Sequence, residues 1–103
     1  MLRINREDHA SHILITIEGR LTGDYVGIAN SACDEALSTN IPVTVSLNQV
    51  MEIDALGRAF LRRLLLRRAR LRAIGIYSRY IVRTLRKSVS PRRSEFPRND
   101  WEF

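Results

Sequence analysis

The chain has 103 residues, of which 45% are hydrophobic, and its net charge is +6. This length and composition suit one domain with one modest core rather than two. No apolar stretch reaches the roughly 20 residues that a membrane-spanning helix needs, and the N-terminus does not follow the pattern of an export signal. We therefore expect a cytoplasmic protein that is not inserted in a membrane.

The basic residues are concentrated in the second half of the chain. Residues 1–57 contain three basic and eight acidic residues, whereas residues 58–103 contain 14 basic and three acidic residues. A segment with this excess of positive charge can attract nucleic acid, acidic lipid or an acidic protein surface, and charge alone does not distinguish these partners. Nearly all the basic residues are arginine, a bias that a GC-rich genome also produces without any demand from phosphate binding.

Four segments have the alternating apolar and polar residues that are typical of β-strands. They are residues 2–5, 12–18, 42–47 and 70–76. The first two are separated by polar turn residues, so they predict an antiparallel hairpin that opens the sheet.

Three segments repeat apolar residues at helical spacing. The first helix is expected to run to about Ser38 with Thr22 or Asp24 as its cap, and its core stripe is Val26, Ala29, Cys33, Ala36 and Leu37. The second, residues 55–68, is capped by Asp54, and its apolar members are Leu56, Ala59, Phe60, Leu64 and, less regularly, Leu61 and Leu65. The third, residues 78–86, has Ser78 as its expected cap and uses Tyr80, Ile81, Val82 and Leu85.

The predicted order β-β-α-β-α-β-α indicates an α/β fold, with a mixed sheet of about four strands covered by about three helices. We expect one domain over residues 1–87. Residues 88–103 contain prolines and no regular period, which predicts a flexible basic C-terminal tail.

No pattern of catalytic or metal-binding residues stands out. His9 and His12 lack nearby ligands at metal-binding spacing, and the chain has neither a Gly-rich phosphate loop nor a Ser, His and acid constellation. We therefore expect no enzyme activity, no metal and no cofactor. The arginine-rich run over residues 58–72 makes nucleic-acid binding an alternative, although no aromatic residue in it offers a stacking platform.

One strand, loop and helix resemble the STAS domain of anti-sigma-factor antagonists. In that family a hydrophobic strand leads through a short loop to an Asp, two small residues and a Gly that opens a helix. Residues 43–57 are similar in order, with Asp54, Ala55, Leu56 and Gly57 at these positions. Residues 18–21 also resemble the family's turn after a strand, and the order of elements over residues 2–86 is the family's order.

The resemblance implies a non-catalytic regulator that binds an anti-sigma factor or a related signalling protein. Many family members are switched off by phosphorylation of a Ser or Thr after the Asp, where this chain has Ala55. Alanine has no hydroxyl group, so that switch is excluded at this position and binding should be constitutive. Ser46 also departs from the acidic or amide residue that is common in the family's strand.

The family's partner-binding surface corresponds here to the end of the strand and the following helix. We expect the partner-binding residues to be Met51, Glu52, Asp54, Ala55, Leu56, Arg58 and Arg62. Helix capping alone is the other interpretation of Asp54, and core packing is the other interpretation of Leu56. An accessory or scaffold subunit of a larger complex is the alternative function, beside nucleic-acid binding.

Overall fold

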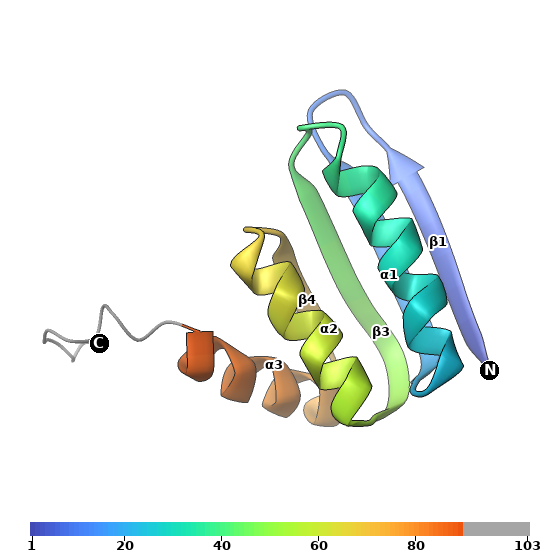
Figure 1. Cartoon of the computed structure of the whole chain (residues 1–103), viewed down its shortest axis with the longest axis vertical. Helices are drawn as coiled ribbons and strands as arrows, with labels where there is room; N and C mark the ends of the chain where they lie inside the picture. Colours follow the sequence, from blue (N-terminus) through green and yellow to red (C-terminus); the bar gives the residue numbers. More distant parts are fainter. Residues whose placement is uncertain (90–103) are drawn as a thin grey trace, which may run out of the picture.

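Four strands with alternating apolar residues form one sheet. The computed structural model describes residues 1–89. The elements in chain order are β1 (Leu2–Asp8), β2 (Ile13–Leu21), α1 (Asp24–Leu37), β3 (Val43–Ile53), α2 (Ala55–Leu66), β4 (Arg70–Ile74) and α3 (Ile76–Val89). Figure 1 shows the elements in these positions. The predicted order and the predicted α/β class are confirmed.

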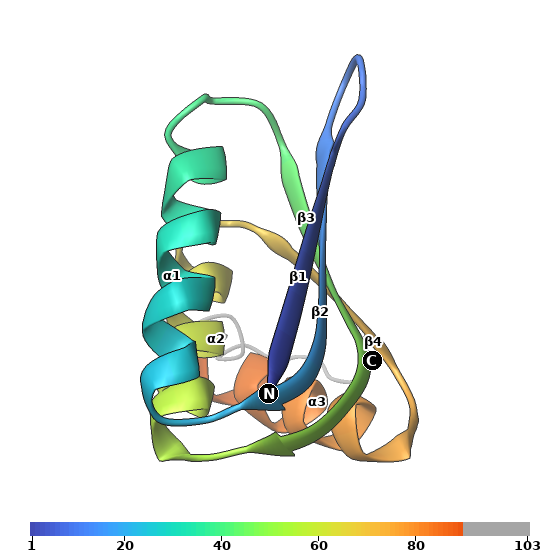
Figure 2. The ribbon, with the colours of Figure 1, turned by 90° about the vertical axis from the view of Figure 1, so that its right-hand side faces the viewer.

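The sheet is mixed, with the strand order β1-β2-β3-β4. Strands β1 and β2 pair antiparallel as the predicted hairpin, whereas β2, β3 and β4 run parallel. Helices α1 and α2 cover one face of the sheet (Figure 2), and α3 packs against α2 and β4. At the β4 edge, the Arg86 guanidinium donates a hydrogen bond of 2.7 Å to the Leu71 carbonyl.

The core lies between the sheet and its helices. The alternating strand residues Ile13, Ile15, Ile17, Val43, Val45 and Leu47 are buried there. From the helices, the core receives Val26, Ala29, Cys33, Ala36, Phe60, Leu61, Leu64, Ile81, Val82 and Leu85. The predicted core stripe of α1 is thus confirmed, with Leu37 partly buried.

Three residues predicted for the core lie at the surface. Leu56 and Tyr80 are mostly exposed, and Ala59 is exposed as well. Leu56 is the second residue of α2 and Tyr80 the fifth residue of α3, so both lie near the starts of their helices. Ala59 lies on the face of α2 opposite the buried Gly57 and Phe60. Periodicity identified the apolar residues but not the part of each helix that the sheet covers.

Strands β2 and β3 are longer than the sequence predicts. Gly19 and Gln49, at φ 103° and φ 58°, accompany register shifts between the two strands. Gly19 pairs with Val50 between the two shifts, and pairing continues with Arg20 and Glu52 and with Leu21 and Ile53. Because a bulge interrupts a strand without ending it, residues that resemble strand breakers lie inside continuous strands.

The helix boundaries also differ from the prediction. The N-cap of α1 is Gly23, without any side-chain cap, so neither Thr22 nor Asp24 has the predicted role. Helix α3 begins at Ile76, directly after Gly75, which makes the buried Ser78 an internal residue and not a cap.

Helix α3 continues to Val89, so the first two residues of the predicted tail are helical. The rest of that predicted tail, residues 90–103, lies outside the described residues. No helix in residues 1–89 combines the length and the apolar character needed to cross a membrane.

Candidate functional site

Asp54 joins three elements at the end of β3. It is the N-cap of α2, and its Oδ1 accepts the backbone N–H of Gly57 at 2.8 Å. Its Oδ2 accepts the N–H of Gly23, directly before α1, at 2.9 Å. The hydrogen bond from Gly57 and, to a smaller extent, that from Gly23 lower the pKa of Asp54 because they stabilise the ionised carboxylate. The predicted capping role of Asp54 is confirmed.

Gly57 allows α2 to approach the end of β2 closely. A Cβ atom at this position would overlap the backbone carbonyl oxygen of Leu21 and would lie 2.9 Å from Cγ2 of Ile53. Any residue larger than glycine must therefore push the helix away from the sheet. The Asp54 cap and the absent side chain of Gly57 together fix the start of α2.

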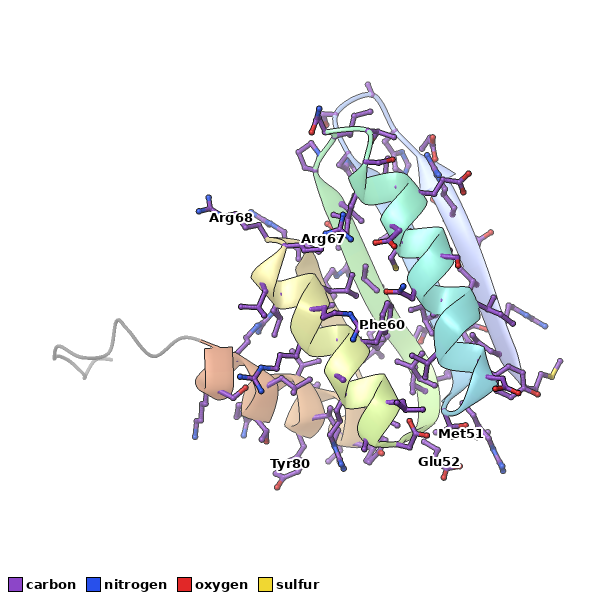
Figure 3. The ribbon with its side chains drawn as sticks, viewed as in Figure 1. Met51, Glu52, Phe60, Arg67, Arg68 and Tyr80 are labelled. Carbon is purple, nitrogen blue, oxygen red and sulfur yellow. The ribbon has the colours of Figure 1, made fainter. Side chains whose placement is uncertain are left out.

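The predicted partner-binding residues around Asp54 are accessible. Met51, Glu52 and Ala55 are exposed, and Leu56 has 59% of its surface exposed. Glu52 lies 3.8 Å from Arg20 on the neighbouring strand, an ion pair between two exposed side chains. Figure 3 shows Met51 and Glu52 at the end of the molecule where α2 begins.

The structure does not bring all these residues onto one face. Leu56 and Arg58 are two residues apart on α2, which places them about 160° apart around the helix axis. Leu56 shares its flank with Arg67, which pairs with Asp34 of α1. Arg62 follows Arg58 by one turn, so these two arginines form a separate basic flank.

Further exposed apolar residues lie at the same end of the sheet. Because β3 and β4 are parallel, both end there, and α3 begins directly after β4. Ile76 is 90% exposed and Tyr80 points outward from α3 (Figure 3). We call Met51, Leu56, Ile76 and Tyr80 the strand-end surface.

Tyr77 connects α3 to this site and was missed by sequence analysis. Its hydroxyl oxygen accepts the N–H of Ile53 at 3.0 Å, and the hydroxyl lies 3.4 Å from the carbonyl oxygen of the same residue. The two residues are 24 positions apart, and no local pattern relates them. Tyr77 therefore holds the residue before Asp54 from the side of α3.

The arginine-rich run does not form one continuous surface. Arg58 and Arg62 lie on α2, Arg67 pairs with Asp34 of α1, and Arg70 and Arg72 lie on β4. The arginine-rich run over residues 58–72 is thus divided among different parts of the molecule.

The two histidines stack on each other beside the hairpin turn. Their ring centroids are 4.6 Å apart, and Nε2 of His9 lies 3.4 Å from Oε1 of Glu7. Over residues 1–89, no three His, Cys, Asp or Glu side chains are grouped so that they could hold a metal ion.

Comparison with known proteins gives little similarity. No protein-family model matches the chain, and no curated protein matches it. A solved structure described as "Crystal Structure Analysis of Mglu in its glutamate form" is similar over 68% of this chain, with 19% sequence identity and a TM-score of 0.38. The match spans 26% of that structure's chain, and a similarity of this extent does not indicate a function.

Proposed function

We propose that this chain is a non-catalytic, STAS-like regulator that acts in the cytoplasm by binding an anti-sigma factor or another signalling protein. The observation that carries the proposal is the strand-end surface, whose four apolar residues are exposed at the end of the sheet where Asp54 joins β3 to α2. Several large apolar side chains exposed at one end of a domain favour a protein interface there. The resemblance of residues 43–57 to the STAS domain supports the same location.

The proposed interface is held by well-defined backbone contacts. Asp54 accepts hydrogen bonds from Gly23 and Gly57, and Tyr77 contacts Ile53. A surface that is ordered before binding loses little conformational entropy when its partner docks. The central apolar residues would supply most of the binding energy, since buried anchors dominate interfaces.

Ala55 determines how such binding is regulated. It is the first residue of α2 and is exposed, beside the carboxylate of Asp54. Its methyl side chain cannot accept a phosphoryl group, so no charge can be added at this position to repel the partner. We propose that this chain binds its partner constitutively, in contrast to members of the family that are switched by phosphorylation.

The test compares two substitutions on one helix. Leu56→Asp places a charge in the strand-end surface, whereas Leu66→Asp places the same charge on the last residue of α2, about 15 Å away along the axis. Leu56 and Leu66 are both largely exposed, so neither substitution should unfold the domain, which circular dichroism would verify. Wild type and both variants would be used for affinity capture from the native host, with identification by mass spectrometry.

We expect wild type and Leu66→Asp to enrich an anti-sigma factor or related signalling protein, and Leu56→Asp to lose it. Equal recovery of this partner by all three proteins would contradict the assignment of the strand-end surface as the interface. Recovery of the components of a membrane transport complex would favour the accessory-subunit alternative instead.

A further inference from the structure

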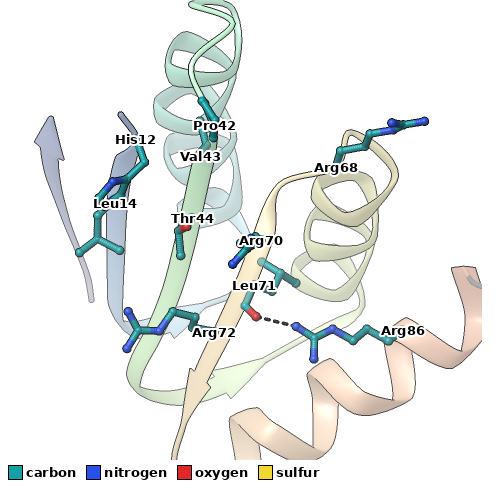
Figure 4. A pocket seen from close by; sticks show the side chains of 10 residues that line it. All are labelled: His12, Leu14, Pro42, Val43, Thr44, Arg68, Arg70, Leu71, Arg72 and Arg86. Atoms are coloured by element: carbon teal, nitrogen blue, oxygen red, sulfur yellow. Dashed lines mark hydrogen bonds between the residues drawn. The ribbon is translucent and has the colours of Figure 1, made fainter. Parts of the chain in front are cut away.

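A groove lies at the end of the sheet opposite the strand-end surface. It has a volume of about 730 Å³ and is lined by residues from β2, β3, β4 and α3, together with Arg68 before β4 (Figure 4). Thr44 and Arg70, at the starts of β3 and β4, are partners in the sheet register. Leu14, paired with Thr44, belongs to the same face, which is opposite the face that α1 and α2 cover.

Four arginine residues line this groove, and none of its lining residues is acidic. The side chain of Arg68 extends away from those of Arg70 and Arg72 (Figure 4). We call Arg68, Arg70, Arg72 and Arg86 with their surroundings the arginine groove. In residues 1–89, none of the four forms an ion pair, whereas Arg3, Arg6, Arg20 and Arg67 each pair with a carboxylate. The groove thus collects cationic groups that the described part of the protein leaves without counter-charge.

The placement of these arginines suits phosphate groups. Arg70 and Arg72 alternate on one strand, so their side chains leave the same face about 7 Å apart. A guanidinium group offers paired N–H donors that match the oxygens of a phosphate. Thr44 adds a hydroxyl group, and Leu14 adds apolar surface for a non-phosphate part of a ligand.

The charges around the groove favour a compact ligand over a long polyanion. Across the sheet, the same face carries Glu18 on β2 and Glu7 on β1. Glu18 pairs with Arg3, its register partner, and Glu7 lies beside His9, so this part of the face adds no free positive charge for a nucleic-acid strand that crosses the sheet. The groove also lacks a free aromatic platform for bases, because the His12 ring, its one aromatic side chain, already stacks on His9.

We propose that the arginine groove binds a small organic ligand through two or three linked phosphate groups, held mainly by Arg70 and Arg72. This site is separate from the strand-end surface and does not depend on the function proposed for it. Arg86 contributes charge while its hydrogen bond to Leu71 keeps it in place.

The probe is inorganic triphosphate, titrated into the protein in a calorimeter. Arg70→Gln/Arg72→Gln removes two charges from the groove, and Arg58→Gln/Arg62→Gln removes two from the exposed face of α2 as the matched control. All four arginines are exposed, so both variants should retain the fold. We expect the groove variant to weaken triphosphate binding at least about tenfold and the control to stay within about twofold of wild type.

A second arm of the experiment uses single-stranded DNA of about 20 nucleotides, titrated at several salt concentrations. The proposal predicts weaker binding of DNA than of inorganic triphosphate. Absence of triphosphate binding, or equally weakened triphosphate binding in the two double variants, would refute the proposed ligand site in the groove. Tighter DNA binding with a steep dependence on salt would assign these arginines to nucleic acid instead.

Discussion

Asp54 accepts a hydrogen bond from the backbone N–H of Gly23, a residue 31 positions earlier in the chain, at 2.9 Å. Its other oxygen accepts the N–H of Gly57. The carboxylate thus ties the loop before α1 to the start of α2. Asparagine has a single acceptor oxygen in its side chain, so Asp54→Asn can keep one of these two hydrogen bonds but not both.

We expect Asp54→Asn to lower the melting temperature near pH 7 and to make the melting temperature depend less on pH in the acidic range. The pKa of Asp54 is lowered in the folded state, so its stabilising contribution is complete above the unfolded pKa of about 4. That contribution is lost as the pH falls through the folded pKa.

Thermal unfolding from about pH 2 to about pH 7 would measure the effect. The difference between wild type and variant should shrink below about pH 4. Arg6 lowers the pKa of Asp8 as well, but both proteins contain this pair and its titration cancels. A difference that stays constant over the whole range would contradict the role of the carboxylate charge.

Substitution of two helical glycines by alanine should have opposite effects. At Gly57 the new methyl group meets the Leu21 carbonyl, so we expect Gly57→Ala to destabilise the fold by about 1–3 kcal/mol. At Gly27, in α1, nothing lies within 4 Å of the added Cβ. Gly27→Ala should therefore stabilise the fold by about 0.5–1 kcal/mol through its higher helix propensity. Chemical denaturation would measure both. A Gly57→Ala variant as stable as wild type would contradict the close approach at Gly57, and a destabilised Gly27→Ala variant would contradict the open space at Gly27.

Cys33 should be unreactive in the folded protein. It is 1% exposed, and burial, followed by the neighbouring Asp34, raises the pKa of its thiol to about 12. Since the thiolate is the reactive form, iodoacetamide at about pH 8 should modify native protein very slowly and denatured protein readily. Intact mass after timed exposure would show this, and rapid labelling of the native protein would disprove the core assignment.

The fold was largely predictable because its apolar pattern is regular. The alternation of Ile13, Ile15 and Ile17 and the helical spacing of Val26, Ala29 and Cys33 each follow from local geometry. The predicted ends of β2 and β3 were wrong because the strands continue through irregular pairing near Gly19 and Gln49. That irregularity depends on the neighbouring strand and not on the local sequence. Local sequence does not distinguish a residue that ends a strand from one that bends it.

The candidate site was predictable in part. The cap at Asp54 follows from its position before an apolar helix, and its bond to Gly57 is local. Its bond to Gly23 and the contact of Tyr77 with Ile53 depend on how distant segments pack. Tyr80 was predicted for the core because helical spacing identifies an apolar residue without showing whether another element covers it.

Arg86 has a further consequence for the edge of the sheet. Strand β4 is an outer strand in the described part of the protein, and outer strands present free backbone groups to which another chain can pair. The Arg86 guanidinium already occupies the Leu71 carbonyl, so an incoming strand must displace a charged donor before it can add to the sheet. The same arginine therefore lines the groove and occupies a backbone acceptor at the edge of the sheet, which makes that edge a poorer template for an added strand.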